Sequence, residues 1–160
     1  MQLSTKGRYA VMAMVDLAAR QAADAGAGPV CLADIAERQQ LSQSYLEQLF
    51  SKLRRAGIVS SARGPGGGYR LARPASEIAI AAIVAAVDEP IKATRCEIGG
   101  GGCLVAAEPG GCGERCQTHD LWFELGRQIA LFLEGVTLAD VVDGRVAGRA
   151  VGLAPRMVSA

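Results

Sequence analysis

The amino-acid sequence predicts a mainly α-helical protein with a small β-hairpin wing, in which a winged helix-turn-helix domain is followed by a long C-terminal dimerisation helix. Two short amphipathic segments around a turn, within residues 32–57, predict the helix-turn-helix. A glycine-rich hairpin pattern at 58–71 predicts the wing, and an apolar repeat that begins near Thr118 predicts the long helix. We expect a DNA-binding domain at 1–75, a linker helix, cysteine loop (92–119) and dimerisation helix at 76–143, and a disordered tail at 144–160.

Composition places the chain among globular proteins. It has 160 residues, of which 50% are hydrophobic and 21% are charged. No run of about 18 apolar residues and no signal peptide are present, so we expect a cytoplasmic protein without a membrane span. Residues 1–80 carry a net charge of +4 and residues 81–160 a net charge of −3. The basic half is therefore the better candidate for a nucleic-acid face, although an excess of this size is also common on solvated surfaces.

The first helix should begin near Ser4 and end near Ala22. Asp16 and Arg20 lie on its polar side, and residues 24–29 break it. Its apolar stripe is Tyr9, Ala10, Ala13, Met14, Leu17 and Ala18.

A short second helix from Leu32 to about Arg38 and a third helix that ends at Gly57 form the helix-turn-helix. Ser42 and Ser44 are alternative N-caps of the third helix, and Ser44 with Glu47 has the spacing of a capping box. The second helix of such a motif can enter the major groove of DNA. A generic pair of packed helices would show much of the same pattern, and the segment that follows decides between the two.

That segment predicts a strand, a glycine-rich turn and a second strand. Glycines allow the tip of the hairpin to approach a nucleic-acid backbone closely, and Arg63 and Arg70 flank it. The glycines at 64–68 do not form a nucleotide-binding loop, because neither a Gly-Lys-Ser/Thr sequence nor a helix follows them. With a single histidine and no paired carboxylates, we expect no enzyme activity.

Beyond the wing, Ser76 can cap a helix that continues through Val87. Thr137 with Asp140 can cap a last short helix through Val142. The long helix between them has more apolar residues than a small domain can cover, so we assign its stripe partly to a two-fold partner. This stripe is Leu121, Trp122, Leu125, Ile129, Phe132 and Leu133.

Four of the five cysteines lie in a glycine-rich loop that ends at the only histidine. Such a loop cannot build an apolar core, whereas a metal held by thiolates and an imidazole can order it. The candidate ligands are Cys96, Cys103, Cys112, Cys116 and His119. From the spacing alone, an iron–sulfur cluster and a structural zinc ion are equally good interpretations. Cys31 lies far from this loop, and we expect it to be a small buried residue.

The sequence resembles the IscR-like iron–sulfur cluster regulators, a family of dimeric winged-helix repressors of cluster-assembly genes. The resemblance covers residues 1–143 and is carried by LSTKGRYAVMAM, LADIAERQQLSQSYLEQLFSKLRRAGIVSSARGPGGGYRL, AVDEPIKATRC and CQTHDLW. It implies a 2Fe–2S cluster held by three cysteines and one histidine, supplied by the iron–sulfur assembly machinery. Cys96, Cys116 and His119 match the family's ligands, and either Cys103 or Cys112 is the third cysteine, with the other a bystander.

The resemblance also implies the DNA contacts. Ser44, Tyr45 and Glu47 would face the bases, and Arg63 would reach the minor groove from the wing. Candidates for phosphate or base-edge contacts are Lys6, Arg8, Gln48, Lys52 and Arg54. Three alternatives stay open: a zinc-binding winged-helix regulator, a cluster-free thiol sensor on the same fold, and a small iron–sulfur electron carrier. The electron carrier leaves the helix-turn-helix and the wing unexplained.

Overall fold

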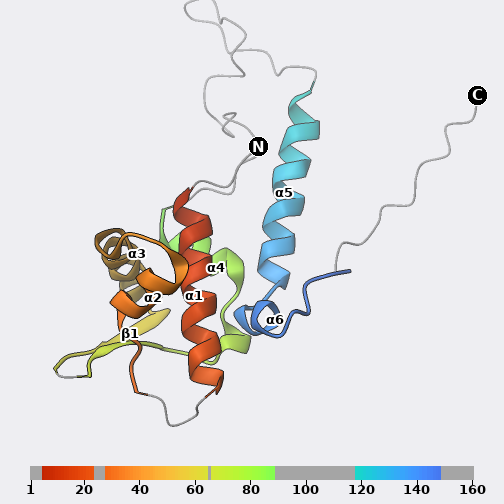
Figure 1. Ribbon diagram of the computed structural model, residues 1–160. Coiled ribbons are helices and arrows are strands. Elements are labelled where there is room, and N and C mark those ends of the chain that lie inside the picture. Colours follow the sequence, from red (N-terminus) through yellow and green to blue (C-terminus); the bar gives the residue numbers. More distant parts are fainter. Residues whose placement is uncertain (1–4, 24–27, 65, 89–117, 149–160) are drawn as a thin grey trace, which may run out of the picture.

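The computed structural model describes residues 5–23, 28–64, 66–88 and 118–148. Helix α1 lies at its centre and contacts α2, α3, α4, α6 and the wing strand β2 (Figure 1). The elements in chain order are α1 (Thr5–Ala23), α2 (Leu32–Gln39), α3 (Gln43–Arg55), β1 (Val59–Ala62), β2 (Gly68–Leu71), a short 3-10 helix η1 (Ala75–Glu77), α4 (Ile80–Ala86), α5 (His119–Gly135) and α6 (Leu138–Val142). The prediction of a mainly helical protein with a hairpin wing is confirmed.

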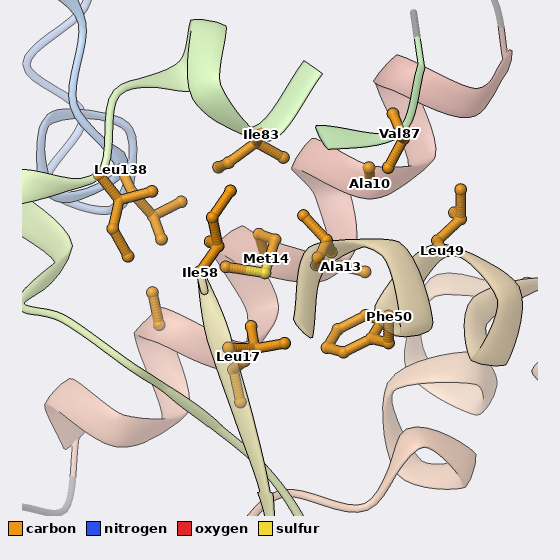
Figure 2. Packing of buried hydrophobic residues seen from close by; sticks show 14 of the residues in the cluster. Ala10, Ala13, Met14, Leu17, Leu49, Phe50, Ile58, Ile83, Val87 and Leu138 are labelled. Atoms are coloured by element: carbon orange, nitrogen blue, oxygen red, sulfur yellow. The ribbon is translucent and has the colours of Figure 1, made fainter. Parts of the chain in front are cut away.

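The hydrophobic core forms around the predicted stripe of α1. Ala10 and Ala13 are fully buried, and their small side chains let neighbouring elements approach α1 closely (Figure 2). Larger side chains from α1, α3, the start of the wing, α4 and its C-cap, and α6 fill the space around them: Met14, Leu17, Leu49, Phe50, Ile58, Ile83, Val87 and Leu138. Each such side chain contributes about 1.5–3 kcal/mol when it is fully buried. Tyr9 alone of the predicted stripe stays half-buried, with its ring edge-on to Tyr45 at a centroid distance of 6.2 Å.

The end of α3 is closed by backbone hydrogen bonds at the glycine that the sequence indicated. Gly57 adopts a left-handed conformation with φ +68°. Its N–H donates to the carbonyl of Arg54, and the N–H of Ile58 donates to the carbonyl of Leu53, both at 3.0 Å. These two bonds form a Schellman motif, which satisfies carbonyls that the helix itself leaves unpaired. The motif directs the chain from α3 straight into the wing.

The start of α3 follows the first of the two predicted N-cap alternatives. The helix begins at Gln43 with Ser42 as N-cap, so the Ser44–Glu47 capping box does not form. The hydroxyl oxygens of Ser42 and Ser44 lie 2.9 Å apart, and Glu47 instead accepts a hydrogen bond from Nε2 of Gln43 at 3.1 Å. The Glu47 carboxylate therefore bonds to a side chain four residues earlier on the same helix, and it does not cap the helix N-terminus.

The start of α4 and the position of Cys31 are also different. Ser76 does not cap α4, because it lies in η1 and α4 begins after Ala79. The first amide of α4, that of Ile80, donates to the carbonyl of Val136 at 2.9 Å, so the chain that enters α6 satisfies it. Cys31 is exposed rather than buried, because it is the extended N-cap residue of α2.

The wing is an antiparallel hairpin that is attached to the helical core. Val59 pairs with Leu71 and Ala62 with Gly68. Behind the hairpin, Tyr69 exchanges two backbone hydrogen bonds with Val30, at 2.8 and 2.9 Å. The N–H of Leu71 donates to Oε1 of Gln21 in α1 at 3.1 Å. The base of the wing is therefore tied to both α1 and the segment before α2.

Helix α5 contacts α4 and projects beyond the rest of the bundle in Figure 1. Its predicted stripe is divided: Leu125, Ile129 and Leu133 are half-buried, whereas other large apolar residues are exposed. The exposed residues are Leu121, Trp122, Phe123, Leu131 and Phe132, of which Leu121 is 62% exposed. Phe123 and Leu131 were absent from the predicted stripe.

The chain then turns into α6, which begins with the predicted capping box. Oγ1 of Thr137 accepts from the N–H of Asp140 at 3.2 Å, and the Asp140 carboxylate accepts from the N–H of Thr137 at 3.0 Å. Two other predicted segments lie outside the described residues: most of the cysteine loop, and residues 149–160 of the tail.

Candidate nucleic-acid interface

Helix α3 has one apolar face and one polar face. Leu46, Leu49, Phe50 and Leu53 are buried, with spacings of three and four residues that place them on one side of the helix. The opposite side exposes Ser44, Glu47, Gln48 and Arg54, and Tyr45 and Lys52 are half-buried at its edges. The structure therefore brings six of the predicted DNA-contacting residues together on α3, on and beside the surface that points away from the core.

Hydrogen bonds fix several of these side chains. Gln43 donates to Glu47, as described above, and Nη1 of Arg54 donates to Oγ of Ser61 in β1 at 3.3 Å. Sequence reasoning missed Gln43 and Ser61 as members of this surface. The i, i+4 spacing of Gln43 and Glu47 is a signal that could have identified the first pair. The contact of Arg54 with Ser61 depends on how the wing folds back, which local sequence does not reveal.

The tip of the wing carries Arg63 beside a tight turn. Gly64 and Gly66 have positive φ values of +104° and +74°, and the N–H of Gly67 donates to the carbonyl of Gly64 at 2.8 Å. Such angles favour glycine because side chains with a Cβ are strained there. Arg63 and Arg70 are both exposed on this hairpin. The wing thus presents guanidinium groups on a backbone that can approach another surface closely.

Lys6 and Arg8 extend the basic surface onto the first turns of α1, where both are exposed. Nζ of Lys52 lies 2.6 Å from Oδ2 of Asp88, the residue that follows α4 and Val87. The hydrogen bond from Lys52, together with the positive charges of Lys52 and Lys6, lowers the pKa of the exposed Asp88 carboxyl. Asp88 was not among the predicted site residues.

A second ion pair holds α2 in place against α1. The Arg38 guanidinium donates to both carboxylate oxygens of Asp16, with Nε 3.2 Å from Oδ1 and 3.1 Å from Oδ2, and Gln39 adds a bond of 2.9 Å to Oδ2. Burial favours the neutral acid and raises the pKa of Asp16, but the hydrogen bonds from Arg38 and Gln39 outweigh it, so the pKa is lowered. These contacts join α1 to α2 and hold α2, the first helix of the helix-turn-helix, in position.

The predicted metal ligands are placed only in part. Cys96, Cys103, Cys112 and Cys116 lie outside the described residues, and His119 is the first residue of α5. Within the described part of the chain, no group of three potential metal-ligating side chains comes together. The indole N–H of Trp122 donates to Oγ1 of Thr118 at 3.2 Å, across the start of α5.

A two-helix motif with a polar outer helix, followed by a glycine-tipped hairpin with exposed arginines, defines a winged-helix DNA-binding protein. Residues 3–144 match the Rrf2 family, which is described as iron-dependent transcriptional regulators. The chain belongs to the Rrf2 family, and it is a transcriptional regulator rather than an enzyme.

Individual relatives agree with this assignment. The HTH-type transcriptional regulator IscR of Serratia proteamaculans is 52% identical over 145 residues, which is 91% of this chain and 81% of the relative. The structure of T. potens IscR is similar with a TM-score of 0.64 and 37% identity, covering 95% of this chain and 94% of that one. The structure of CymR, described as the global cysteine regulator of B. subtilis, has a TM-score of 0.69 and 34% identity, covering 90% and 98%. Among the described residues, no helix is long and apolar enough to cross a membrane.

Proposed function

We propose that the chain is a homodimeric repressor that senses the supply of iron–sulfur clusters through a 2Fe–2S cluster and controls the genes of cluster assembly. The observation that carries the proposal is the order of the functional elements along the chain. A recognition helix and a wing are followed by a segment with four cysteines, which leads into a helix that begins at His119. The relatives named IscR support the same assignment.

The cysteine and histidine side chains of the predicted site are suitable ligands for a 2Fe–2S cluster. Thiolates are the usual ligands of 2Fe–2S clusters, and imidazole replaces thiolate in some of them. His119 is the first residue of α5, at the positive end of the helix dipole, and Cys116 precedes it by three residues in the sequence. This end favours a thiolate and disfavours an imidazolium, which are the ligand forms that a metal needs. A bound cluster supplies a redox-sensitive and labile centre that local charge and hydrogen bonding tune. Its proposed source is the iron–sulfur assembly machinery.

Dimerisation is proposed to bury the apolar side of α5. Leu121, Trp122 and Leu131 are 62, 42 and 47% exposed, although α5 is also in contact with α4. Exposed apolar side chains in such a group are typical of an interface with another protein surface. A two-fold partner would place a second α3 at the next turn of the DNA, with half-site centres about 34 Å apart.

Base recognition is assigned to the polar face of α3. Glu47 has a carboxylate held by Gln43, and a carboxylate can accept a hydrogen bond from the amino group of cytosine while phosphates repel it. Ser44 and Tyr45 complete the proposed base-facing group. Lys6, Arg8, Gln48, Lys52, Arg54 and the wing residue Arg63 are the proposed phosphate, base-edge and minor-groove contacts.

The proposal is tested by single alanine substitutions in the full chain, purified without oxygen. Iron and sulfide content and the visible spectrum are measured for each variant. Cys96→Ala, Cys116→Ala and His119→Ala should lose or destabilise the cluster, and so should one of Cys103→Ala and Cys112→Ala. We favour Cys103 as the third cysteine ligand. Cys112 is only four residues from Cys116, so it could partly take the place of Cys103 in Cys103→Ala. Cys31→Ala is the matched control, because Cys31 is exposed at the start of α2 and should leave the cluster unchanged.

Three results would change the assignment. A colourless protein that contains zinc indicates a structural zinc site with the same four ligands. A normal cluster in His119→Ala indicates that four cysteines hold the metal. Normal clusters in both Cys103→Ala and Cys112→Ala show that these two thiols are interchangeable.

A further inference from the structure

Asp88 faces a cation of the recognition helix from outside the helix-turn-helix. Its Oδ2 lies 2.6 Å from Nζ of Lys52, and the two residues are 36 positions apart in the chain. The Asp88 side chain is 77% exposed and that of Lys52 is 34% exposed. An ion pair between exposed groups is weak in water. Lys52 can therefore exchange this carboxylate for a DNA phosphate at little cost.

The backbone holds the Asp88 carboxylate in this position. Asp88 has φ +58°, a left-handed conformation that is uncommon for residues other than glycine and that aspartate tolerates better than most. Its N–H donates to the carbonyl of Ala85 at 3.1 Å, and the preceding side chain, Val87, is fully buried. Left-handed backbone at a non-glycine residue is a feature that proteins often keep at functional positions.

The charges around Asp88 match those around a bound phosphate. Lys52 of α3 is in direct contact with the carboxylate, and Lys6 of α1 is close enough to act on it electrostatically. Both lysines are proposed phosphate contacts. The carboxylate thus contacts one cation and feels the charge of a second, in a place where a phosphate oxygen would also be favoured.

We propose that Asp88 competes with DNA phosphate for Lys52. The carboxylate holds the Lys52 ammonium in the free protein, and a phosphate contact requires that the ammonium leaves it. This inference rests on the proposed function in one respect, the assignment of Lys52 to the DNA interface.

Competition lowers the affinity for DNA in general. Cation–phosphate contacts form at random and at specific sites alike, and a specific site gains further energy from the bases. The free energy needed to separate Lys52 from Asp88 is the same at both kinds of site. Asp88 therefore sets the strength of DNA binding and leaves the preference for one sequence over another unchanged.

The test compares four full-length proteins in the metal-free state: the wild type, Asp88→Asn, Lys52→Gln and the double variant. Binding is measured to a random-sequence duplex and to a duplex that the wild type selects from a random pool, over a range of salt concentrations. Asp88→Asn should bind random DNA several-fold more tightly, with a salt slope steeper by up to about one unit. In the Lys52→Gln background the same substitution should have little effect. Glu77→Gln removes an equal charge from η1, which packs on α6, and it should not change binding.

Several outcomes would overturn the competition. Equal tightening in both backgrounds, or by Glu77→Gln as well, would mean that only net charge matters. Weaker binding by Asp88→Asn would mean that the ion pair positions α3. If Lys52→Gln binds DNA as tightly as the wild type, Lys52 does not contact DNA.

Discussion

Phe50 of the recognition helix packs edge-on against Tyr69 of the wing, with ring centroids 4.9 Å apart and planes inclined by 68°. Phe50 is fully buried and Tyr69 is half-buried, and Tyr69 is also the wing residue that pairs with Val30. Aromatic pairs in this geometry contribute about 0.5–1.5 kcal/mol beyond the burial of their surface. The contact joins α3 to the wing, so the two proposed DNA-reading elements are positioned as one unit.

Gly68→Ala should loosen this attachment. A Cβ at Gly68 would lie 2.3 Å from the carbonyl oxygen of Val30, which is backbone and cannot rotate away. We expect a loss of about 1–3 kcal/mol in the free energy of unfolding, together with weaker DNA binding, because the wing must shift. Gly28→Ala is the control, since nothing lies within 4 Å of a Cβ there. Denaturant unfolding and DNA titration measure the two effects, and equal behaviour of both variants would contradict the packing argument.

Arg63→Ala should weaken DNA binding and make it less dependent on salt. Arg63 is exposed at the tip of the wing, and removal of one phosphate contact lowers the slope of log K against log salt by about 0.9. The measurement is a salt titration on a fixed duplex. Arg127→Ala serves as the control, because Arg127 pairs with Glu124 on α5, at 3.0 Å, rather than lying on the wing. If the slope stays at its wild-type value, Arg63 is not a DNA contact.

Glu47→Ala should relax specificity more than it lowers affinity. The substitution removes a selective hydrogen-bond acceptor and, at the same time, a charge that phosphates repel. Discrimination between cytosine and other bases at the contacted position should fall by about 1–3 kcal/mol. Binding to a library of single-base variants measures this, with Glu37→Ala on the exposed side of α2 as the control. Equal weakening on cognate and random DNA would show that Glu47 does not read a base.

Asp16→Asn should destabilise the fold at neutral pH and less in acid. The folded protein lowers the pKa of Asp16 below its ordinary value of 3.8, so the ionised form favours folding. The stabilisation is complete above that value and is lost as the pH falls through the lower pKa of the folded state. Loss of the hydrogen bonds from Arg38 should cost about 1–3 kcal/mol at pH 7.

Thermal unfolding, measured between pH 7 and pH 3, tests how the stabilisation by ionised Asp16 decreases with pH. The difference in stability between the wild type and Asp16→Asn should become smaller toward the acidic end. Glu134→Gln, at the exposed end of α5, is the control for a change of one charge. A difference between the wild type and Asp16→Asn that is constant with pH would contradict the assigned role of the carboxylate.

Local patterns in the sequence determine most of the secondary structure of this protein. The apolar stripes of α1, α2 and α3 have helical spacing, and Gly57 and the wing glycines occupy turns that disfavour other residues, so these elements were predictable to within a residue or two. The polar face of α3 follows from the same periodicity, because burial of one side exposes the other. The thiol and imidazole donor set is likewise a property of the sequence alone, and the choice between Cys103 and Cys112 stays a prediction.

Tertiary structure decided the features that join distant segments. The pairs Asp16–Arg38 and Lys52–Asp88 link residues 22 and 36 positions apart. The first amide of α4 is satisfied by Val136 rather than by Ser76. Exposure of Cys31 and the division of the α5 stripe depend on which neighbours cover each surface. A residue's own propensity specifies its backbone, but its partner and its burial depend on the packing of elements far apart in the chain, and that packing exists only in the folded protein.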